Sequence, residues 1–178
     1  SRGLLSARLA RDGADIAAAQ KLRHRVFHAE RGLSGFDTDA DRFDPICDHL
    51  LVTDTRDGAL VGTYRLLRQE VAEAHGGFYS QDEFDLEPLL ARHRHLRFLE
   101  LGRSCVLAPY RNKRTVELLW HGIHAYVMQN RCDVMIGCAS LEGTEPKQLA
   151  LTLSFLHHYA RAPEEWRARA LPERYVEM

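Results

Sequence analysis

The sequence lacks long apolar runs, an excess of one charge and paired cysteine motifs, and each absence argues against a class of protein. The longest apolar runs are only a few residues, so no segment is expected to span a membrane. The formal net charge is -1, which argues against a nucleic-acid-binding surface. The first residues, SRGLLSARLARDG, have no continuous apolar stretch and are not typical of a signal peptide.

The cysteines and histidines give no sign of a metal site. Cys47, Cys105, Cys132 and Cys138 show neither CxxC nor CxxH spacing, so we expect reduced thiols in a cytosolic protein. The adjacent pair His157 and His158 would point about 100° apart on a helix, which makes a poor chelate. No metal is therefore predicted.

Apolar spacing predicts alternating strands and helices in a chain long enough for one domain with a sizeable core. The predicted strands cover 4–9, 49–54, 59–67, 96–107 and 133–140, with a hairpin turn at 57–58. The first predicted helix begins near Asp12 or Asp15, and three further helices cover 82–92, 113–130 and 147–159. This order predicts an α/β (α+β) fold, a mixed sheet with helices on its faces.

Two charges interrupt the apolar strand in FLELGRSCVLAPYRNKR, residues 98–114. Glu100 and Arg103 are three apart, so in a regular strand they would face opposite sides. A bulge at Gly102 would turn both to one face. An internal salt bridge is one explanation, but a buried pair seldom adds much stability, which favours a functional site.

A basic turn and the predicted helix 113–130 follow this strand. Arg111, Lys113 and Arg114 lie where the helix begins, and a helix N-terminus with basic side chains attracts anions. A solvated surface turn is the equally weighted alternative. The turn has no glycine-rich phosphate cradle, so a nucleotide is not indicated.

The segments RFDPICDHLLV, FLELGRSCVLAPYRNKRTVELLWHGIHAYVMQNRCDVMIGCASLEGT and LSFLHHY…APEEWRARALPERYVEM together resemble the ornithine acyl-ACP N-acyltransferase family. That family makes lyso-ornithine lipid, is often labelled hemolysin-like, and is related to the acyl-homoserine-lactone synthases. The resemblance runs from about Ala18 to Met178. It implies a GNAT-like sheet, mixed and mostly antiparallel, flanked by helices and with a splayed strand pair at the acyl site.

The resemblance carries over to individual polar residues. The motifs LRHRVF, DRFD, GTYRLL and ELGR place the family's site positions at Arg23, Phe27, Asp41, Asp44, Arg65, Glu100 and Arg103. The synthases' tryptophan after the first helix is missing, and Phe36 is the only nearby aromatic, which argues against homoserine-lactone synthesis. The x-x-G-x-G pyrophosphate loop is also missing, which favours a carrier-bound thioester over CoA. Residues 1–178 are expected to form a single GNAT-like acyltransferase domain that lacks the family's C-terminal extension.

The family's chemistry assigns roles to these residues. An amine must lose a proton to attack a thioester, and Glu100 is the predicted base, with Arg103 orienting it and the acidic pair. Backbone N–H groups at the bulge would stabilise the oxyanion. Asp41 or Asp44 would bind ornithine's second ammonium, and Arg23 or Arg65 its carboxylate.

The resemblance also implies partners and a location. Arg111, Lys113, Arg114 and Thr115 are predicted to meet acyl carrier protein or its pantetheine arm, helped by the basic segment 91–97. The acyl-ACP thioester is a substrate, and no cofactor is expected. The implied enzyme is cytoplasmic, with its hydrophobic product bringing it into transient contact with the inner membrane. Other amino-acid acceptors, a homoserine-lactone-type synthase, a non-catalytic carrier-binding module and a membrane-lytic protein remain as alternatives.

Overall fold

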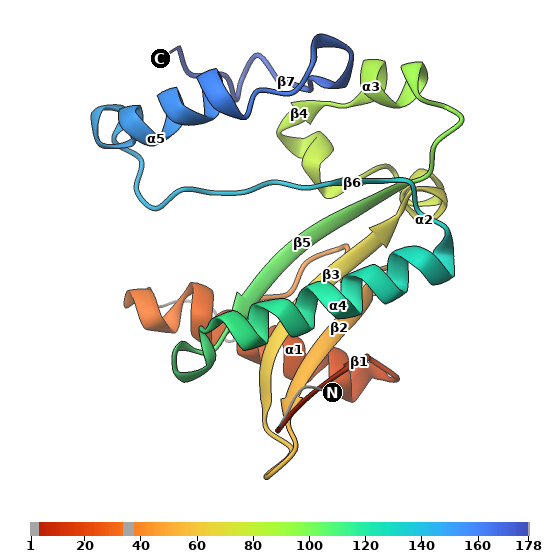
Figure 1. The fold of residues 1–178 in the computed structure, drawn as a ribbon, viewed down its shortest axis with the longest axis vertical. Helices are drawn as coiled ribbons and strands as arrows, with labels where there is room; N and C mark the ends of the chain where they lie inside the picture. Colours follow the sequence, from red (N-terminus) through yellow and green to blue (C-terminus); the bar gives the residue numbers. More distant parts are fainter. Residues whose placement is uncertain (1–3, 34–37, 178) are drawn as a thin grey trace.

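The computed structural model describes residues 4–33 and 38–177 (Figure 1). A five-stranded sheet has the order β1-β2-β3-β5-β6. Its strands are β1 (Leu5–Leu9), β2 (Asp48–Asp54), β3 (Leu60–Arg68), β5 (Phe98–Val106) and β6 (Val134–Ile136). The first four pair antiparallel with their neighbours, and only β5 and β6 run parallel. The predicted mixed, mostly antiparallel sheet is therefore confirmed.

Two helices cover opposite faces of this sheet, with α4 in front and α1 behind in Figure 1. Helix α1 (Gly13–Phe27) begins after Asp12, whose side chain accepts a hydrogen bond from the Asp15 backbone N–H at 3.0 Å. Helix α4 (Lys113–Asn130) begins after Asn112, which caps it in the same way. On α4 the buried residues that pack on the sheet are Leu118, Leu119, Ile123 and Tyr126.

The segment 82–92 is not the single helix that its composition predicts. It contains the end of a 3-10 turn η2 (Tyr79–Asp82), a short strand β4 (Phe84–Asp85) and then helix α3 (Glu87–Arg92). The helix begins late because Pro88, in its first turn, suits that position. Strand β4 pairs with the distant strand β7 (Arg169–Ala170), a contact that local sequence does not reveal.

The remaining short elements are one helix and three 3-10 turns. Helix α2 (Gln69–Ala74), which sequence spacing does not predict, packs against β3 and β5. Phe43, Phe78 and Phe98 belong to a second apolar cluster, which holds Trp166 of the 3-10 turn η4 (Glu164–Trp166) at its edge. The 3-10 turns η1 (Ala29–Arg31) and η3 (Ala108–Tyr110) follow α1 and precede α4.

Helix α5 (Pro146–Tyr159) stands away from the main sheet (Figure 1). None of its residues is buried, and the large side chains Leu151, Phe155, Leu156 and Tyr159 are exposed. Within the described ranges, no helix is long and apolar enough to cross a membrane.

Candidate functional site

Strand β5 carries a β-bulge where the sequence predicts one. On β3 a single residue separates Thr63 from Arg65, whereas two residues, Arg103 and Ser104, separate their partners on β5. The bulge is confirmed, but its left-handed residue is Arg103, with φ 51°, and not Gly102. A non-glycine residue in this region is strained, so surrounding contacts must hold Arg103 in place.

Strands β5 and β6 form the splayed pair that the resemblance implies. They pair only from Phe98 to Glu100 on β5, and the chain after β6 then diverges from β5 (Figure 1). Gly137 marks the point of divergence, where an added Cβ would lie 2.3 Å from the Leu101 carbonyl oxygen. The predicted strand 133–140 is therefore wrong beyond Ile136, because the chain turns away there.

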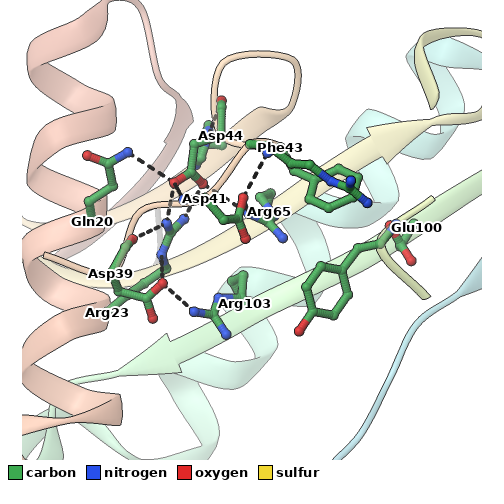
Figure 2. Close-up of polar contacts among 12 residues, drawn as sticks. Gln20, Arg23, Asp39, Asp41, Phe43, Asp44, Arg65, Glu100 and Arg103 are labelled. Atoms are coloured by element: carbon green, nitrogen blue, oxygen red, sulfur yellow. Dashed lines mark hydrogen bonds and ion pairs between the residues drawn. The ribbon is translucent and has the colours of Figure 1, made fainter. Parts of the chain in front are cut away.

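The predicted acidic and basic site residues lie together and bind one another (Figure 2). Arg23 of α1 donates two hydrogen bonds to Asp44, at 2.8 and 2.7 Å. Arg65 of β3 donates to Asp41 at 2.6 Å and to Asp44 at 3.1 Å. Gln20 donates a further bond to Asp44 at 3.0 Å. Arg23, Arg65 and Asp44 are buried, so this network is internal.

The charge of Asp44 is fixed by these arginines. Burial by itself would raise the pKa of Asp44, but the hydrogen bonds and the charge of Arg23 outweigh it and hold the pKa below its usual range. Its two oxygens together accept five hydrogen bonds, including one from the Asp41 backbone N–H. The prediction that Asp44 binds a substrate ammonium would require one of these bonds to break.

Arg103 binds Asp39, a residue that the sequence reasoning missed. Its guanidinium donates to Asp39 Oδ1 and lies 5.1 Å from the Phe27 ring centre. Arg23 also donates to the Asp39 carbonyl, so Asp39 joins Arg103 to the network. The prediction that Arg103 orients Glu100 and the acidic pair is therefore wrong, because the carboxylate that Arg103 contacts is that of Asp39. The acidic repeat DADRFD contains the only local signal for Asp39.

Glu100 is buried and holds the 3-10 turn η2. Its carboxylate accepts from the Tyr79 backbone N–H at 2.8 Å, the Ser80 backbone N–H at 2.7 Å and the Ser80 hydroxyl at 2.5 Å. The Tyr79 ring in turn faces the Arg65 guanidinium. Glu100 therefore binds η2 whereas Arg103 binds Asp39, and no ion pair joins the two in the described part of the chain.

A groove of about 700 Å³ lies between the end of α1, the bulge and the start of α4. Phe27, Glu30, Ser104, Cys105, Arg111, Asn112, Lys113 and Glu142 are among its lining residues. It lies at the C-terminal end of β5. The groove therefore joins the predicted basic turn to the bulge.

The basic turn is only partly available to a ligand. Arg111 donates to Glu30 and to the Val106 carbonyl, whereas Lys113 is 90% exposed and Arg114 is exposed. Thr115 is fully buried, and its backbone N–H and hydroxyl both donate to Asn112. Its burial removes Thr115 from the predicted binding surface.

Two other predictions concern the basic segment 91–97 and the aromatic residue Phe36. The basic segment 91–97 precedes β5, at the end opposite to the turn, so the two basic segments do not form one patch. Phe36 lies outside the described residues. Among the described residues, no group of acidic, histidine or cysteine side chains is arranged to hold a metal ion.

The four thiols are expected to differ in reactivity. All four are free, and burial raises the pKa of Cys47 and of Cys105 to about 12. Burial also raises the pKa of the half-buried Cys132 and Cys138, but these thiols are more accessible, so at pH 8 we expect iodoacetamide to label them faster than the buried pair. Mass spectrometry with and without urea checks this. Labelling of native Cys105 as fast as of Cys138 would contradict this expectation and make Cys105 a candidate nucleophile in the groove.

Residues 22–121 match the family described as acetyltransferase (GNAT) domain. A protein of Agrobacterium fabrum (strain C58) named L-ornithine N(alpha)-acyltransferase is 54% identical over 99% of this chain and 64% of its own length. A protein of the same name from Brucella abortus (strain 2308) is 54% identical over 99% of this chain and 66% of its own length. The chain spans slightly less than two thirds of these relatives. They confirm the family resemblance of the sequence motifs.

Solved structures share the architecture at low identity. FeeM, an N-acyl amino acid synthase from uncultured soil microbes, superposes with a TM-score of 0.56 at 15% identity, covering 85% of this chain and 77% of that protein. The AHL synthase LasI gives 0.54 at 16% identity, covering 75% and 71%. At these identities the likeness concerns the fold alone.

Proposed function

Because the chain belongs to the GNAT acetyltransferase family, we propose that it transfers an acyl chain from a carrier-bound thioester to the α-amine of ornithine. The observation that carries this proposal is the 54% identity, along nearly the whole chain, to proteins named L-ornithine N(alpha)-acyltransferase. The groove and the splayed strands supply a place for the reaction. The product is an amide that joins a fatty acid to an amino acid.

The groove is proposed to receive the donor's pantetheine arm. Its lining includes the exposed Lys113 and, at the bulge, Ser104, so a carrier docked at the start of α4 would direct its arm inward. Acyl carrier proteins are acidic, which complements this basic mouth. No cofactor is needed, since the thioester itself is the activated substrate.

The proposed reaction is a direct attack of the amine on the thioester. An α-amino group with a pKa near about 8 is largely protonated at neutral pH, so it must first give one proton to a base. Its lone pair then forms the C–N bond while the carbonyl electrons move to oxygen. Backbone N–H groups at the bulge would stabilise that oxyanion. Collapse breaks the C–S bond, and the thiolate takes the second nitrogen proton.

The prediction that Glu100 is the base can be separated from its role in holding η2. We expect Glu100→Gln to lower the free energy of unfolding by about 1–3 kcal/mol, because the amide NH₂ would face a backbone N–H. If Glu100 is the base, thiol release by the folded Glu100→Gln protein should fall by about 10²-fold or more. Urea titration and single-turnover assays check both. Thiol release near the wild-type rate would contradict the base and leave Glu100 as a structural residue.

The test of the function is a thiol-release assay with a 3-hydroxyacyl carrier protein. Ornithine, other amino acids or no amine are added, and product masses are recorded. We expect ornithine-dependent thiol release and an amide product. Thiol release with a different amino acid, and none with ornithine, would identify that amino acid as the acceptor. Carrier binding without turnover for any amine would overturn the proposal and favour a non-catalytic carrier-binding module.

A further inference from the structure

Three buried polar atoms near the bulge have no hydrogen-bond partner. Among residues 4–33 and 38–177, four such side-chain atoms occur, and three of them are Arg23 Nε, Asp39 Oδ2 and Arg103 Nε. These three residues contact one another. Buried polar groups are nearly always paired, so a cluster of unpaired ones points to a missing ligand.

Asp39 and Arg103 each keep one atom unused. Arg103 Nη2 donates to Asp39 Oδ1, which leaves Oδ2 as an acceptor and Nε as a donor. The Asp39 side chain is 2% exposed, whereas its neighbours Arg103 and His28 are 28% and 24% exposed. His28 Nε2 lies 3.7 Å from Oδ2, beyond hydrogen-bond distance. Among the described residues, Asp39 Oδ2 therefore makes this longer ion-pair contact with His28 and no hydrogen bond.

The charges of the cluster balance. Its three arginines are Arg23, Arg65 and Arg103, and its three aspartates are Asp39, Asp41 and Asp44. A lone cation or anion would upset this balance. A ligand group that carries one positive and one negative charge would not. Arg23 Nε faces Asp39 Oδ1 at 3.7 Å, and the other two atoms, Asp39 Oδ2 and Arg103 Nε, offer one acceptor for an ammonium and one donor for a carboxylate.

We infer that Asp39 and Arg103 bind the main-chain end of the acceptor amino acid. Asp39 Oδ2 accepts from the α-ammonium, and Arg103 Nε donates to the α-carboxylate. This inference rests on the proposed function. Because Arg103 lies in the bulge, just beyond the last residue of β5 that pairs with β6, the site holds the amine beside the splayed strands.

The inference replaces the predicted role of Arg23 or Arg65 in holding the acceptor's carboxylate. The hydrogen bonds already made by Asp44 and Asp41 also bear on their predicted role with the second ammonium. Asp44 already accepts five hydrogen bonds, and Asp41 Oδ1 accepts from Arg65 and from the Phe43 backbone. Binding an ammonium at Asp44 would break existing bonds, whereas binding at Asp39 completes unmade ones. Asp41, whose side chain is 25% exposed, supports Arg65 from the edge of the network.

Ligand binding tests the inference without turnover. Titration calorimetry compares ornithine with 1,4-diaminobutane, which lacks the carboxylate, and 5-aminopentanoate, which lacks the α-amine. An unreactive acyl-pantetheine thioether is present throughout. The wild-type protein is expected to bind ornithine about tenfold or more tightly than either analogue, because each analogue leaves one charged partner unpaired. Equal binding of ornithine and 1,4-diaminobutane would overturn the inference.

Variants assign each contact to its residue. Asp39→Asn is expected to weaken the binding of ornithine about tenfold and to leave the binding of 5-aminopentanoate unchanged. Arg103→Lys is expected to weaken the binding of ornithine and to leave the binding of 1,4-diaminobutane unchanged. The matched controls are Asp82→Asn and Arg42→Lys, in an exposed ion pair, and they should not change the binding of any of the three ligands. Equal weakening of all three ligands would indicate a structural role and overturn the assignment.

The wild-type comparison does not depend on whether either variant folds, so it keeps the test decisive. Thiol release by the wild type, measured separately, distinguishes this inference from the proposed function. Turnover of ornithine without preference over 1,4-diaminobutane sinks the inference alone. No turnover with any amine sinks the proposed function.

Discussion

Asp44→Asn is expected to lower the free energy of unfolding by about 3–5 kcal/mol, the cost of breaking a buried ion pair. The amide cannot serve as an acceptor at both positions, so Arg23 or Arg65 would keep an unpaired buried donor. A loss of this size is a large part of the total stability of a typical domain. Urea unfolding followed by circular dichroism measures it.

Asp82→Asn provides the control for that experiment. Asp82 pairs with Arg42 at the surface, where an ion pair contributes only about 0–1 kcal/mol because water and salt screen it. A loss below about 1 kcal/mol in Asp44→Asn as well would show that the buried network contributes little, contrary to its geometry.

The same network predicts how stability depends on pH. The pKa of Asp44 is lowered in the folded protein, so its contribution is present above the unfolded-state pKa of about 4 and is lost as pH falls below it. We therefore expect the free energy of unfolding to fall on acidification, and to fall less steeply in Asp44→Asn. Urea titrations at a series of pH values check this. Equal acid dependence in both proteins would contradict it.

Gly137→Ala is expected to remove most thiol release. An alanine Cβ would lie 2.3 Å from the Leu101 carbonyl oxygen, and because that atom belongs to the backbone, β5 or the chain after β6 must move. Overpacking of this kind costs about 1–3 kcal/mol. A displacement of about 1 Å at the reacting groups can lower the rate about 10²-fold. Stopped-flow thiol release, at a temperature where the variant is folded, measures the effect.

Gly13→Ala is the matched control. Gly13 opens α1, and an added Cβ there meets no atom within 4 Å. Alanine favours helices, so stability should stay the same or rise by up to about 1 kcal/mol, with thiol release unchanged. A Gly137→Ala protein as active as this control would show that the separation of β5 and β6 does not set the geometry of the reaction.

Local patterns predicted the elements that local forces determine. Helix α4 follows its apolar spacing and its Asn112 cap, and the hairpin between β2 and β3 turns at Gly58, whose φ is 75°. The segment 82–92 was not predictable in this way, because β4 forms only through its pairing with residues far along the chain.

The site shows the same division. The family motifs identified Arg23, Asp44 and Arg65, which the structure brings together. They did not reveal that these charges satisfy one another, because pairing depends on side-chain geometry across three elements. Asp39 and Arg103 are 64 residues apart, and no periodicity links them. The bulge was predictable from its charges, but its left-handed residue was not.

The bulge has a consequence for how copies of the protein meet. Beyond Glu100 the outer edge of β5 has no strand beside it in the described part of the chain, and such an edge is a template for pairing with another molecule. The extra residue and the charged side chain of Arg103 interrupt that edge, so a second strand finds no continuous ladder to extend. The same distortion that separates β5 from the chain after β6 thereby also discourages aggregation through this edge.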